Sequence, residues 1–322
     1  MPFPQPCRCH TEQSSALPCA PCEELQPPSG LPSAPLLWTE QTQEPQLLLR
    51  HLLLQTLHHL CGVPFGHSTR FMSCSVAPKT ALSAGGVNWL IQILNDLIFT
   101  TIRSKPVSTE LPFIECGDPD KYQRMKQIPS PRILATHLNY DFLPKSIFKN
   151  KAKILVLFRN PKDTAVSFFH FHKNVPSVPS YSSWDEFFSE FMNGKVGWGS
   201  YFDHAVTWNK HIDDENTMIV MYEDLKENLA SGVKQIAEFF GFFPTTEQIQ
   251  SIADRATFQA VKNKAQETHG AVGTVLFRKG VVGDWKNLFT EAQNQEMDAK
   301  FKVCLEGTKL GAKLKYDVYC KA

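Results

Sequence analysis

The sequence has almost no net charge and no kinase-type phosphate loop, and each absence argues against a class of function. Its 33 Lys and Arg residues balance 32 Asp and Glu residues, which leaves a formal net charge of +1. Proteins that bind nucleic acid or an anionic membrane usually carry a basic excess, so we expect neither partner. Any anion site must therefore be a local cluster of cations. A small-molecule kinase has no support, because no G-x-x-x-x-G-K-[ST] motif is present.

Long apolar runs are also missing. The N-terminus has no basic segment followed by an apolar one, so we expect no signal peptide. The most apolar early stretch, residues 46–60, contains Arg50, His51, His58 and His59, and it is too short and too polar to cross a bilayer. Nine cysteines, an odd number at irregular spacing, predict reduced thiols. We therefore expect a cytoplasmic protein.

Possible zinc ligands gather in the first 22 residues, at Cys7, Cys9, His10, Cys19 and Cys22. Their spacing fits no zinc finger, and the Pro-rich flanks would not give a stable frame, so we predict no metal site.

The chain changes character near residue 70. Residues 1–44 are rich in Pro, Ser, Gln and Cys without a repeating apolar period, which predicts disorder, and residues 46–60 form a possible Leu-rich helix. We therefore predict a low-complexity, disordered leader with a short helix at 1–70 and one α/β domain at 71–322.

Strand-length apolar runs alternate with helical patterns in the second part of the chain. The predicted strands are Arg132–His137, Lys153–Phe158 and Thr217–Tyr222, and helices are predicted at Val87–Ile102, after Pro161 and before Gly241. The run at 153–158 is apolar on both faces, which is typical of a buried parallel strand. This alternation predicts the α/β class, with a parallel sheet and helices on both faces.

The junction after the strand at 153–158 is the first candidate site. Arg159 ends that strand, and Ser167 lies two turns into the helix that follows. Ligands collect at the carboxyl ends of parallel strands, and a helix N-terminus offers free amides to a phosphate. Both side chains can hold a phosphate from one side. An ion pair between Arg159 and a carboxylate is an equally good interpretation.

The run RKGVVGDWK, residues 278–286, is the second candidate. Arg278 and Lys279 are adjacent cations, and Gly280 and Gly283 allow backbone amides to approach an anion. Glycines at this spacing are common in surface turns. With Arg-Lys before them and Asp-Trp after them, the pattern favours a phosphate site.

Two further groups of residues are candidates for proton transfer and for adenine binding. His137 comes at the end of a predicted strand, where it can take a proton from a hydroxyl or amine. Phe258 can stack on an adenine, with the hydroxyls of Tyr222 and Thr257 near the ring nitrogens. Taken singly, Phe258, Tyr222 and Thr257 are each better explained by core packing or helix capping.

Three segments carry a family resemblance from about Gly85 to the C-terminus: RNPKDTAVSFFHFH, YEDLKENLASGVKQIAEFFG and FRKGVVGDWK. Together they resemble the cytosolic sulfotransferases, most closely the 6B type. The resemblance implies a P-loop-like sheet flanked by helices and the co-substrate 3′-phosphoadenylyl sulfate (PAPS). A sulfuryl group would pass to a small hydroxyl- or amine-bearing acceptor, such as a phenol or thyroid hormone, and the product PAP would leave.

The family pattern implies roles for residues at matching positions. The donor-binding residues that we predict are Gly85, Gly86, Asn88, Trp89, Arg159, Ser167, Tyr222, Thr257, Phe258, Phe277, Arg278, Lys279 and Gly280. Those around the 3′-phosphate would be Arg159, Ser167, Arg278, Lys279 and Gly280. Aromatic residues would contact the adenine, with Trp89 on one of its faces. His137 would be the catalytic base.

One half of the site departs from the pattern. The family loop around the 5′-phosphosulfate reads Tyr-Pro-Lys-Ser-Gly-Thr-x-Trp. Counting back from Trp89, the lysine position is Ala84, and Lys79 lies five residues too far away. A second lysine, often two residues before the catalytic histidine, is Ala135. Two interpretations remain open: Lys79 reaches the site through a bulged loop, or the protein binds PAP or PAPS with weak or no turnover.

Two other segments also differ. The strand before that loop should be strongly apolar, but Arg70–Ala77 is weakly apolar. The family dimer motif reads Lys-x-x-x-Thr-Val-x-x-x-Glu. Between Lys286 and Gln295 this chain has Glu291 in place of Val and Gln295 in place of Glu. The resemblance therefore predicts a homodimer, but the motif that would form its interface is altered.

Overall fold

The computed structural model describes residues 71–76, 84–102, 113–115, 118, 120–128, 130–175, 178–269 and 273–321, with backbone alone at 71–76, 84, 85 and 122. The predicted leader at 1–70, with its helix and zinc-type residues, lies outside the described residues, as does Lys79.

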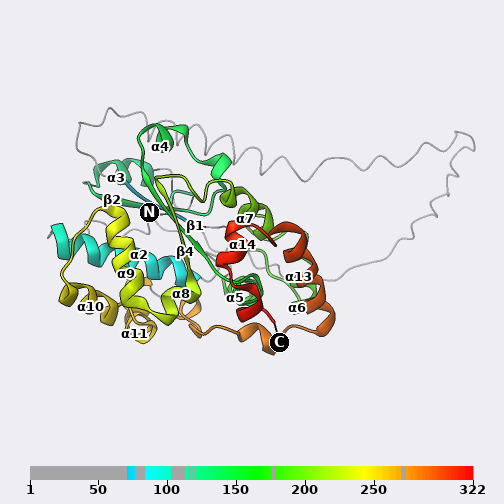
Figure 1. Cartoon of the computed structure of the whole chain (residues 1–322). Helices are drawn as coiled ribbons and strands as arrows, with labels where there is room; N and C mark the ends of the chain where they lie inside the picture. Colours follow the sequence, from blue (N-terminus) through cyan, green and yellow to red (C-terminus); the bar gives the residue numbers. More distant parts are fainter. Residues whose placement is uncertain are drawn as a thin grey trace, which may run out of the picture. The chain divides into compact units, whose positions relative to one another are not determined.

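Four parallel strands form the sheet in the order β2-β1-β3-β4 (Figure 1). Their bounds are Phe71–Val76 (β1), Arg132–Thr136 (β2), Lys153–Phe158 (β3) and Thr217–Met221 (β4). The weakly apolar segment at 71–76 is thus a central strand: Ser73 is opposite Leu134 on one side and Ile154 on the other. Phe113 adds an isolated bridge to Ala135, at the outer edge of β2.

Helices and short 3-10 turns connect and cover these strands. Their bounds are Ala84–Ile102 (α2), Lys121–Gln127 (α3), Tyr140–Phe142 (η1), Lys145–Lys149 (α4), Pro161–Asn174 (α5), Trp184–Met192 (α6), Tyr201–Asn209 (α7), Tyr222–Glu227 (α8), Leu229–Phe240 (α9), Thr246–Arg255 (α10), Phe258–His269 (α11), Gly273–Leu276 (α12), Asp284–Asn287 (η3), Glu291–Cys304 (α13), Lys309–Lys313 (α14) and Tyr316–Tyr319 (α15). Within the described ranges, no helix combines the length and the apolar character that crossing a membrane requires.

Strand β3 faces a hydrophobic core on each side. Ile154, Val156 and Phe158 belong to one cluster, and Leu155 and Leu157 belong to the other. The first cluster takes side chains from α5, α6, α7, α13 and α14, and the second takes them from α2, α9, α10 and α11. Figure 1 shows these two groups of helices on opposite sides of the strands. The predicted parallel strand, buried on both faces, is confirmed.

Some predicted boundaries were wrong by one to three residues. Strand β2 ends at Thr136 and β4 ends at Met221, so His137 and Tyr222 follow their strands. Tyr222 instead begins α8, whose first turn carries Glu223 and Asp224, and acidic residues stabilise a helix N-terminus. Helix α2 begins at Ala84 rather than at residue 87.

Gly241 ends α9 as predicted, with a φ of 74° in the left-handed region. Because a Cβ disfavours that region, we expect Gly241→Ala to lower the free energy of unfolding by about 1–2 kcal/mol, measured by urea denaturation. Gly241→Asn is the control and should lose less, since asparagine tolerates this conformation better. Equal stability of the Gly and Ala proteins would contradict this role of the glycine.

Candidate functional site

The ends of three strands bring predicted residues to one edge of the sheet. His137 follows β2, Arg159 follows β3 and Tyr222 follows β4. Because parallel strands end at the same edge, these residues gather there despite their separation in sequence. The segment that follows β1, residues 77–83, lies outside the described residues.

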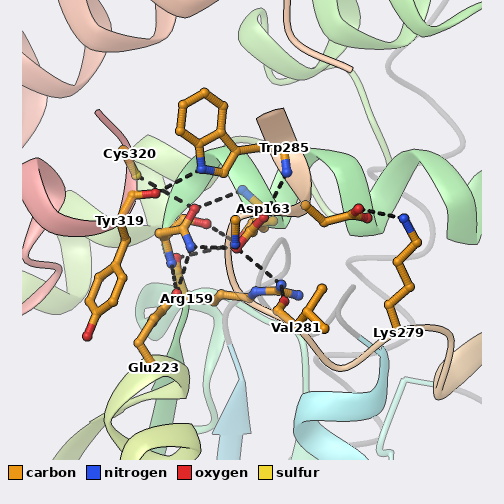
Figure 2. Close-up of polar contacts among 12 residues, drawn as sticks. Arg159, Asp163, Glu223, Lys279, Val281, Trp285, Tyr319 and Cys320 are labelled. Atoms are coloured by element: carbon orange, nitrogen blue, oxygen red, sulfur yellow. Dashed lines mark hydrogen bonds and ion pairs between the residues drawn. The ribbon is translucent and has the colours of Figure 1, made fainter. Parts of the chain in front are cut away.

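The N-terminus of α5 holds the RKGVVGDWK run through Asp163 (Figure 2). Asn160 caps the helix, since its Oδ1 accepts a hydrogen bond from the Asp163 amide at 2.8 Å. The buried Asp163 carboxylate accepts hydrogen bonds from the amides of Gly283, at 2.8 Å, and Trp285, at 3.0 Å. It also lies 3.3 Å from Nη2 of Arg159. One carboxylate therefore joins the strand end, the helix start and a loop more than a hundred residues away.

Glu223 joins the end of β4 to the same junction. Its Oε1 accepts hydrogen bonds from the backbone amide of Asn160, at 2.9 Å, and from the Asn160 side chain, at 2.8 Å. Burial raises the pKa of Glu223, although hydrogen bonds from Asn160 and the charge of Arg159 oppose this effect.

The C-terminal segment packs on this junction through Lys162, which is fully buried. Its Nζ donates to the Cys320 carbonyl at 2.6 Å and pairs with Asp298 at 2.6 Å. Nζ also lies 4.6 Å from the centroid of the Trp285 ring, and the indole nitrogen of Trp285 donates to the Tyr319 carbonyl at 2.8 Å. Figure 2 shows Trp285, Tyr319 and Cys320 beside Asp163. The last residues of the chain thus help to fix the start of α5.

Arg159 is held by contacts of three kinds. Its Nη2 donates to the Val281 carbonyl at 2.7 Å and pairs with Asp163, and its Cζ lies 4.5 Å from the Tyr222 ring centroid. Its buried Nε has no hydrogen-bond partner among the described residues. The ion pair that the sequence left as an alternative is therefore present, and Arg159 still has donor capacity for a ligand.

A pocket lies beside this junction. The predicted donor-binding residues that line it are Trp89, Arg159, Ser167, Tyr222, Phe258, Phe277, Arg278, Lys279 and Gly280. Seven further residues line the pocket without having been predicted to bind the donor: Asp163, Lys226, Val261, Val275, Leu276, Val281 and Asp284. Val281 and Asp284 belong to the RKGVVGDWK run, whereas no local spacing signals the other five.

The pocket has an excess of two positive charges. Its cations are Arg159, Lys226, Arg278 and Lys279, and its carboxylates are Asp163 and Asp284. Burial, followed by the charge of Arg159, lowers the pKa of Lys226. In a chain of net charge +1, this is the kind of local cation cluster that an anion site requires.

Asp284 holds two of these cations in place. Its carboxylate oxygens lie 2.5 Å from Nη2 of Arg278 and 2.6 Å from Nζ of Lys279. Burial acts to raise the pKa of Asp284, but hydrogen bonds from Lys279 and Arg278 outweigh it and lower the pKa to about 2. Asp284 is therefore a carboxylate at neutral pH, and it keeps both cations at the pocket wall.

The two glycines of the loop serve different contacts. Gly280 has a φ of 64°, and a Cβ there would lie 2.2 Å from the Phe258 ring, so this position requires glycine for both reasons. Gly283 has a φ of 89°, and its amide does approach an anion, which is the protein's own Asp163.

Aromatic rings line another part of the pocket. The Trp89 indole nitrogen donates to the Ala256 carbonyl, and its ring meets the Tyr222 ring edge-on at 5.6 Å between centroids. Thr257 does not line the pocket: its hydroxyl accepts from the Ala260 amide at 3.3 Å, at the start of α11. This matches the helix-capping alternative.

Other predicted residues lie apart from the pocket. Gly85, Gly86 and Asn88 are in the first turns of α2, and neither Gly86 nor Asn88 lines the pocket. In the altered dimer motif, Gln295 donates to Glu291 at 3.0 Å within α13. Dimerisation through this motif stays a prediction.

His137 is buried at the end of β2 and does not line this pocket either. Its backbone amide donates to Oε1 of Glu115 at 2.7 Å, and its Nδ1 contacts the same oxygen. Its ring lies 4.7 Å from the ring centroids of Phe113 and Trp198. Burial acts to raise the pKa of Glu115, but the charge of His137 and its hydrogen bonds outweigh burial, so this pKa is lowered. Nothing in the sequence pattern singled out Glu115.

The network around Asp163 makes a stability prediction. Asp163→Asn would replace one acceptor oxygen by an amide NH2 group, which cannot accept a hydrogen bond from the loop amides. We expect it to lower the free energy of unfolding by about 2–4 kcal/mol, measured by urea denaturation. Asp203→Asn is a matched control, because Asp203 occupies the same position of α7 but is exposed. It should change stability by about 0.5 kcal/mol or less. Equal effects of both changes would contradict the anchoring role.

Comparison with known proteins identifies the family. A family model described as "Sulfotransferase domain" matches residues 80–313. Sulfotransferase 6B1 of Pan troglodytes is 67% identical over 236 residues, which cover 73% of this chain and 78% of that protein. Sulfotransferase 6B1 of Danio rerio is 51% identical over 237 residues, which cover 73% and 80% of the two chains.

Solved structures show the same fold. The mouse sulfotransferase SULT7A1 complexed with PAP has a TM-score of 0.67 and 32% identity, over 81% of this chain and 93% of that chain. Retinol dehydratase, in complex with androsterone and the inactive cofactor PAP, shares the fold with a TM-score of 0.61 and 20% identity, over 80% and 86% of the two chains. The parallel sheet, the three sequence motifs and these matches agree: this chain belongs to the sulfotransferase family and is similar to the 6B type.

Proposed function

We propose that this chain transfers a sulfuryl group from PAPS to the hydroxyl or amino group of a small acceptor, such as a phenol or a thyroid hormone. The observation that carries the proposal is the pocket at the sheet edge, lined by nine of the predicted donor-binding residues and holding an excess of two positive charges. Charge-assisted hydrogen bonds from Arg and Lys suit a phosphate, and aromatic faces suit an adenine. The PAP complex of the mouse relative supports the same donor.

In this proposal the pocket residues divide between the two ends of the nucleotide. Those that bind the 3′-phosphate are Arg159, Ser167, Arg278, Lys279 and Gly280, and those that bind the adenine are Trp89, Tyr222 and Phe258. Because Asp163 and Asp284 hold the cations before any ligand arrives, little reorganisation is needed on binding.

The chemistry proposed for His137 is general base catalysis. As the acceptor oxygen or nitrogen attacks sulfur, His137 takes its proton, and the bond between sulfur and the 5′-phosphate oxygen breaks. The electron pair of that bond leaves with PAP. His137 follows β2 and Arg159 follows β3, so both lie at the same edge of the sheet, which supports this role.

A second candidate is a protein that binds PAP or PAPS without useful turnover. The observation that favours it is Ala135, whose fully buried side chain belongs to the hydrophobic core between the sheet and α2. No cation can act from that position, where the family often has lysine. Ala84, at the other lysine position, is the first residue of α2.

Transfer of labelled sulfate from PAPS to phenols and iodothyronines, measured beside PAP binding by calorimetry, separates the two candidates. We expect wild-type transfer, and a loss of about 10²–10⁴ in rate for His137→Ala, because a general base contributes that much. PAP affinity should stay within about twofold, since His137 does not line the donor pocket. PAP binding without transfer by the wild type would favour the second candidate.

Arg278→Ala tests the pocket itself and should weaken PAP binding by about tenfold to a hundredfold, the worth of a charged hydrogen bond. Lys309→Ala, which removes an exposed lysine paired with Asp213, is the matched control and should leave binding unchanged. Unchanged binding by both variants would exclude the proposed 3′-phosphate contact.

Substitution of Lys79 tests whether this residue reaches the site through a bulged loop, one of the two interpretations left open by the sequence. If Lys79 contacts the transferring group, Lys79→Ala should lower the transfer rate by about 10²–10³, as the loss of a charge-stabilising contact does. PAP lacks the sulfuryl group, so its affinity should fall much less. A transfer rate that does not respond to this change would reject the bulged loop.

A further inference from the structure

Glu115 makes two contacts with His137, and neither residue lines the donor pocket. Its Oε1 accepts a hydrogen bond from the His137 backbone amide at 2.7 Å and contacts Nδ1 of the ring. Both side chains are nearly buried, with 9% of His137 and 7% of Glu115 exposed. Among the described residues, Glu115 is the charged group that contacts this histidine. The pair is therefore a buried carboxylate–imidazole dyad at the end of β2.

The chemistry of the pair decides which ring nitrogen carries hydrogen. An ionised carboxylate has only acceptor oxygens, so the Nδ1 that contacts it must be the donor. The hydrogen bonds that Glu115 accepts from the ring and the backbone amide of His137 act to lower its pKa, which favours the ionised carboxylate. In the neutral ring, Nε2 then keeps its lone pair and is the nitrogen that can take a proton.

Neighbouring aromatic rings restrict the imidazole further. Phe113 is nearly parallel to it, at an angle of 4°, and Trp198 is tilted by 33°. Trp198 has a φ of 58°, a conformation that costs energy for a side chain of this size. Rotation of the ring would break both aromatic contacts and the contact with Glu115.

A purely structural role does not explain why both oxygens of the Glu115 carboxylate are buried. Its second oxygen, Oε2, is buried and has no hydrogen-bond partner among the described residues. Burying a carboxylate oxygen without a partner costs stability. A polar group that is only half satisfied in this way is typical of sites where function, rather than stability, sets the residue.

We propose that Glu115 is the positioning residue for His137: it fixes the ring with hydrogen on Nδ1, which makes Nε2 the proton acceptor, and it stabilises the imidazolium that forms. The inference rests on the proposed sulfuryl transfer. In that step the acceptor oxygen bonds to sulfur, its proton moves to Nε2, and the sulfur–oxygen bond to the 5′-phosphate breaks, with its electron pair leaving on PAP. The positive charge created on His137 then lies against the Glu115 carboxylate, which stays ionised.

The test combines a spectroscopic readout with kinetics on the full chain. Long-range ¹H–¹⁵N spectra of the His137 ring, assigned with His137→Asn, report which nitrogen is protonated. Spectra, labelled-sulfate transfer, PAP affinity and melting temperature are measured for the wild type, Glu115→Gln and Glu115→Asp. Asp214→Asn is the matched control, because it removes the carboxylate from an exposed histidine pair, His211–Asp214 at 2.9 Å.

We expect the wild type to have hydrogen on Nδ1 and a free Nε2. Glu115→Gln should give a mixture of both tautomers, because an amide can donate to Nδ1 as well as accept from it. Its transfer rate should fall by between about tenfold and a thousandfold, with PAP affinity within about twofold of wild type. Glu115→Asp should recover part of the rate, and Asp214→Asn should change neither quantity.

Three results would overturn the proposal. The first is a wild-type ring with hydrogen on Nε2, which is decisive even if the variants do not fold. The second is a Glu115→Gln protein with the wild-type tautomer and rate. The third is a Glu115→Gln protein that keeps the tautomer and loses rate, PAP affinity and melting temperature together. A wild type that transfers no sulfate would reject the proposed function instead, and the ring spectra would still decide the role of Glu115.

Discussion

The carboxylate of Asp163 is the contact on which the rest of the pocket depends. It lies at the start of α5 and binds the amides of Gly283 and Trp285, and it pairs with Arg159. Because a buried carboxylate must satisfy its oxygens, these partners have little freedom to move away. The end of β3 and the loop that carries Arg278 are thereby fixed relative to each other, and the cavity between them has a definite shape.

Carboxylates also prepare the cations of the site. Asp163 holds Arg159, and Asp284 holds Arg278 and Lys279, before any anion is present. Each ion pair reduces the repulsion between neighbouring cations, while the pocket as a whole keeps an excess of positive charge. In the proposed function, an entering phosphate would meet donors that are already in position, which is the condition for strong electrostatic binding in a partly buried site.

The two halves of the site differ in how they are supported. The proposed nucleotide half has a wall of hydrogen bonds and ion pairs that extends to the C-terminal segment through Lys162, whose ammonium binds the Cys320 carbonyl and Asp298. In the half around His137, the histidine contacts the rings of Phe113 and Trp198 and the carboxylate of Glu115. Ala135 has an apolar side chain at a position where the family often has lysine. In the proposed function, donor binding and turnover therefore depend on different residues of this chain.

The sequence alone determined the α/β class and the doubly buried strand at 153–158, because each of these depends on residues close together in the chain. The family resemblance indicated most of the residues that line the pocket. Apolar runs, the Asn-Pro start of α5 and the RKGVVGDWK run are local signals. Only the tertiary structure revealed the contacts of Glu115, Asp163 and Lys226 with the site. Glu115 meets His137 across 22 residues, and Asp163 meets Trp285 across 122. Contacts of that range are made by the packing of the sheet and its helices, and no spacing in the sequence records them.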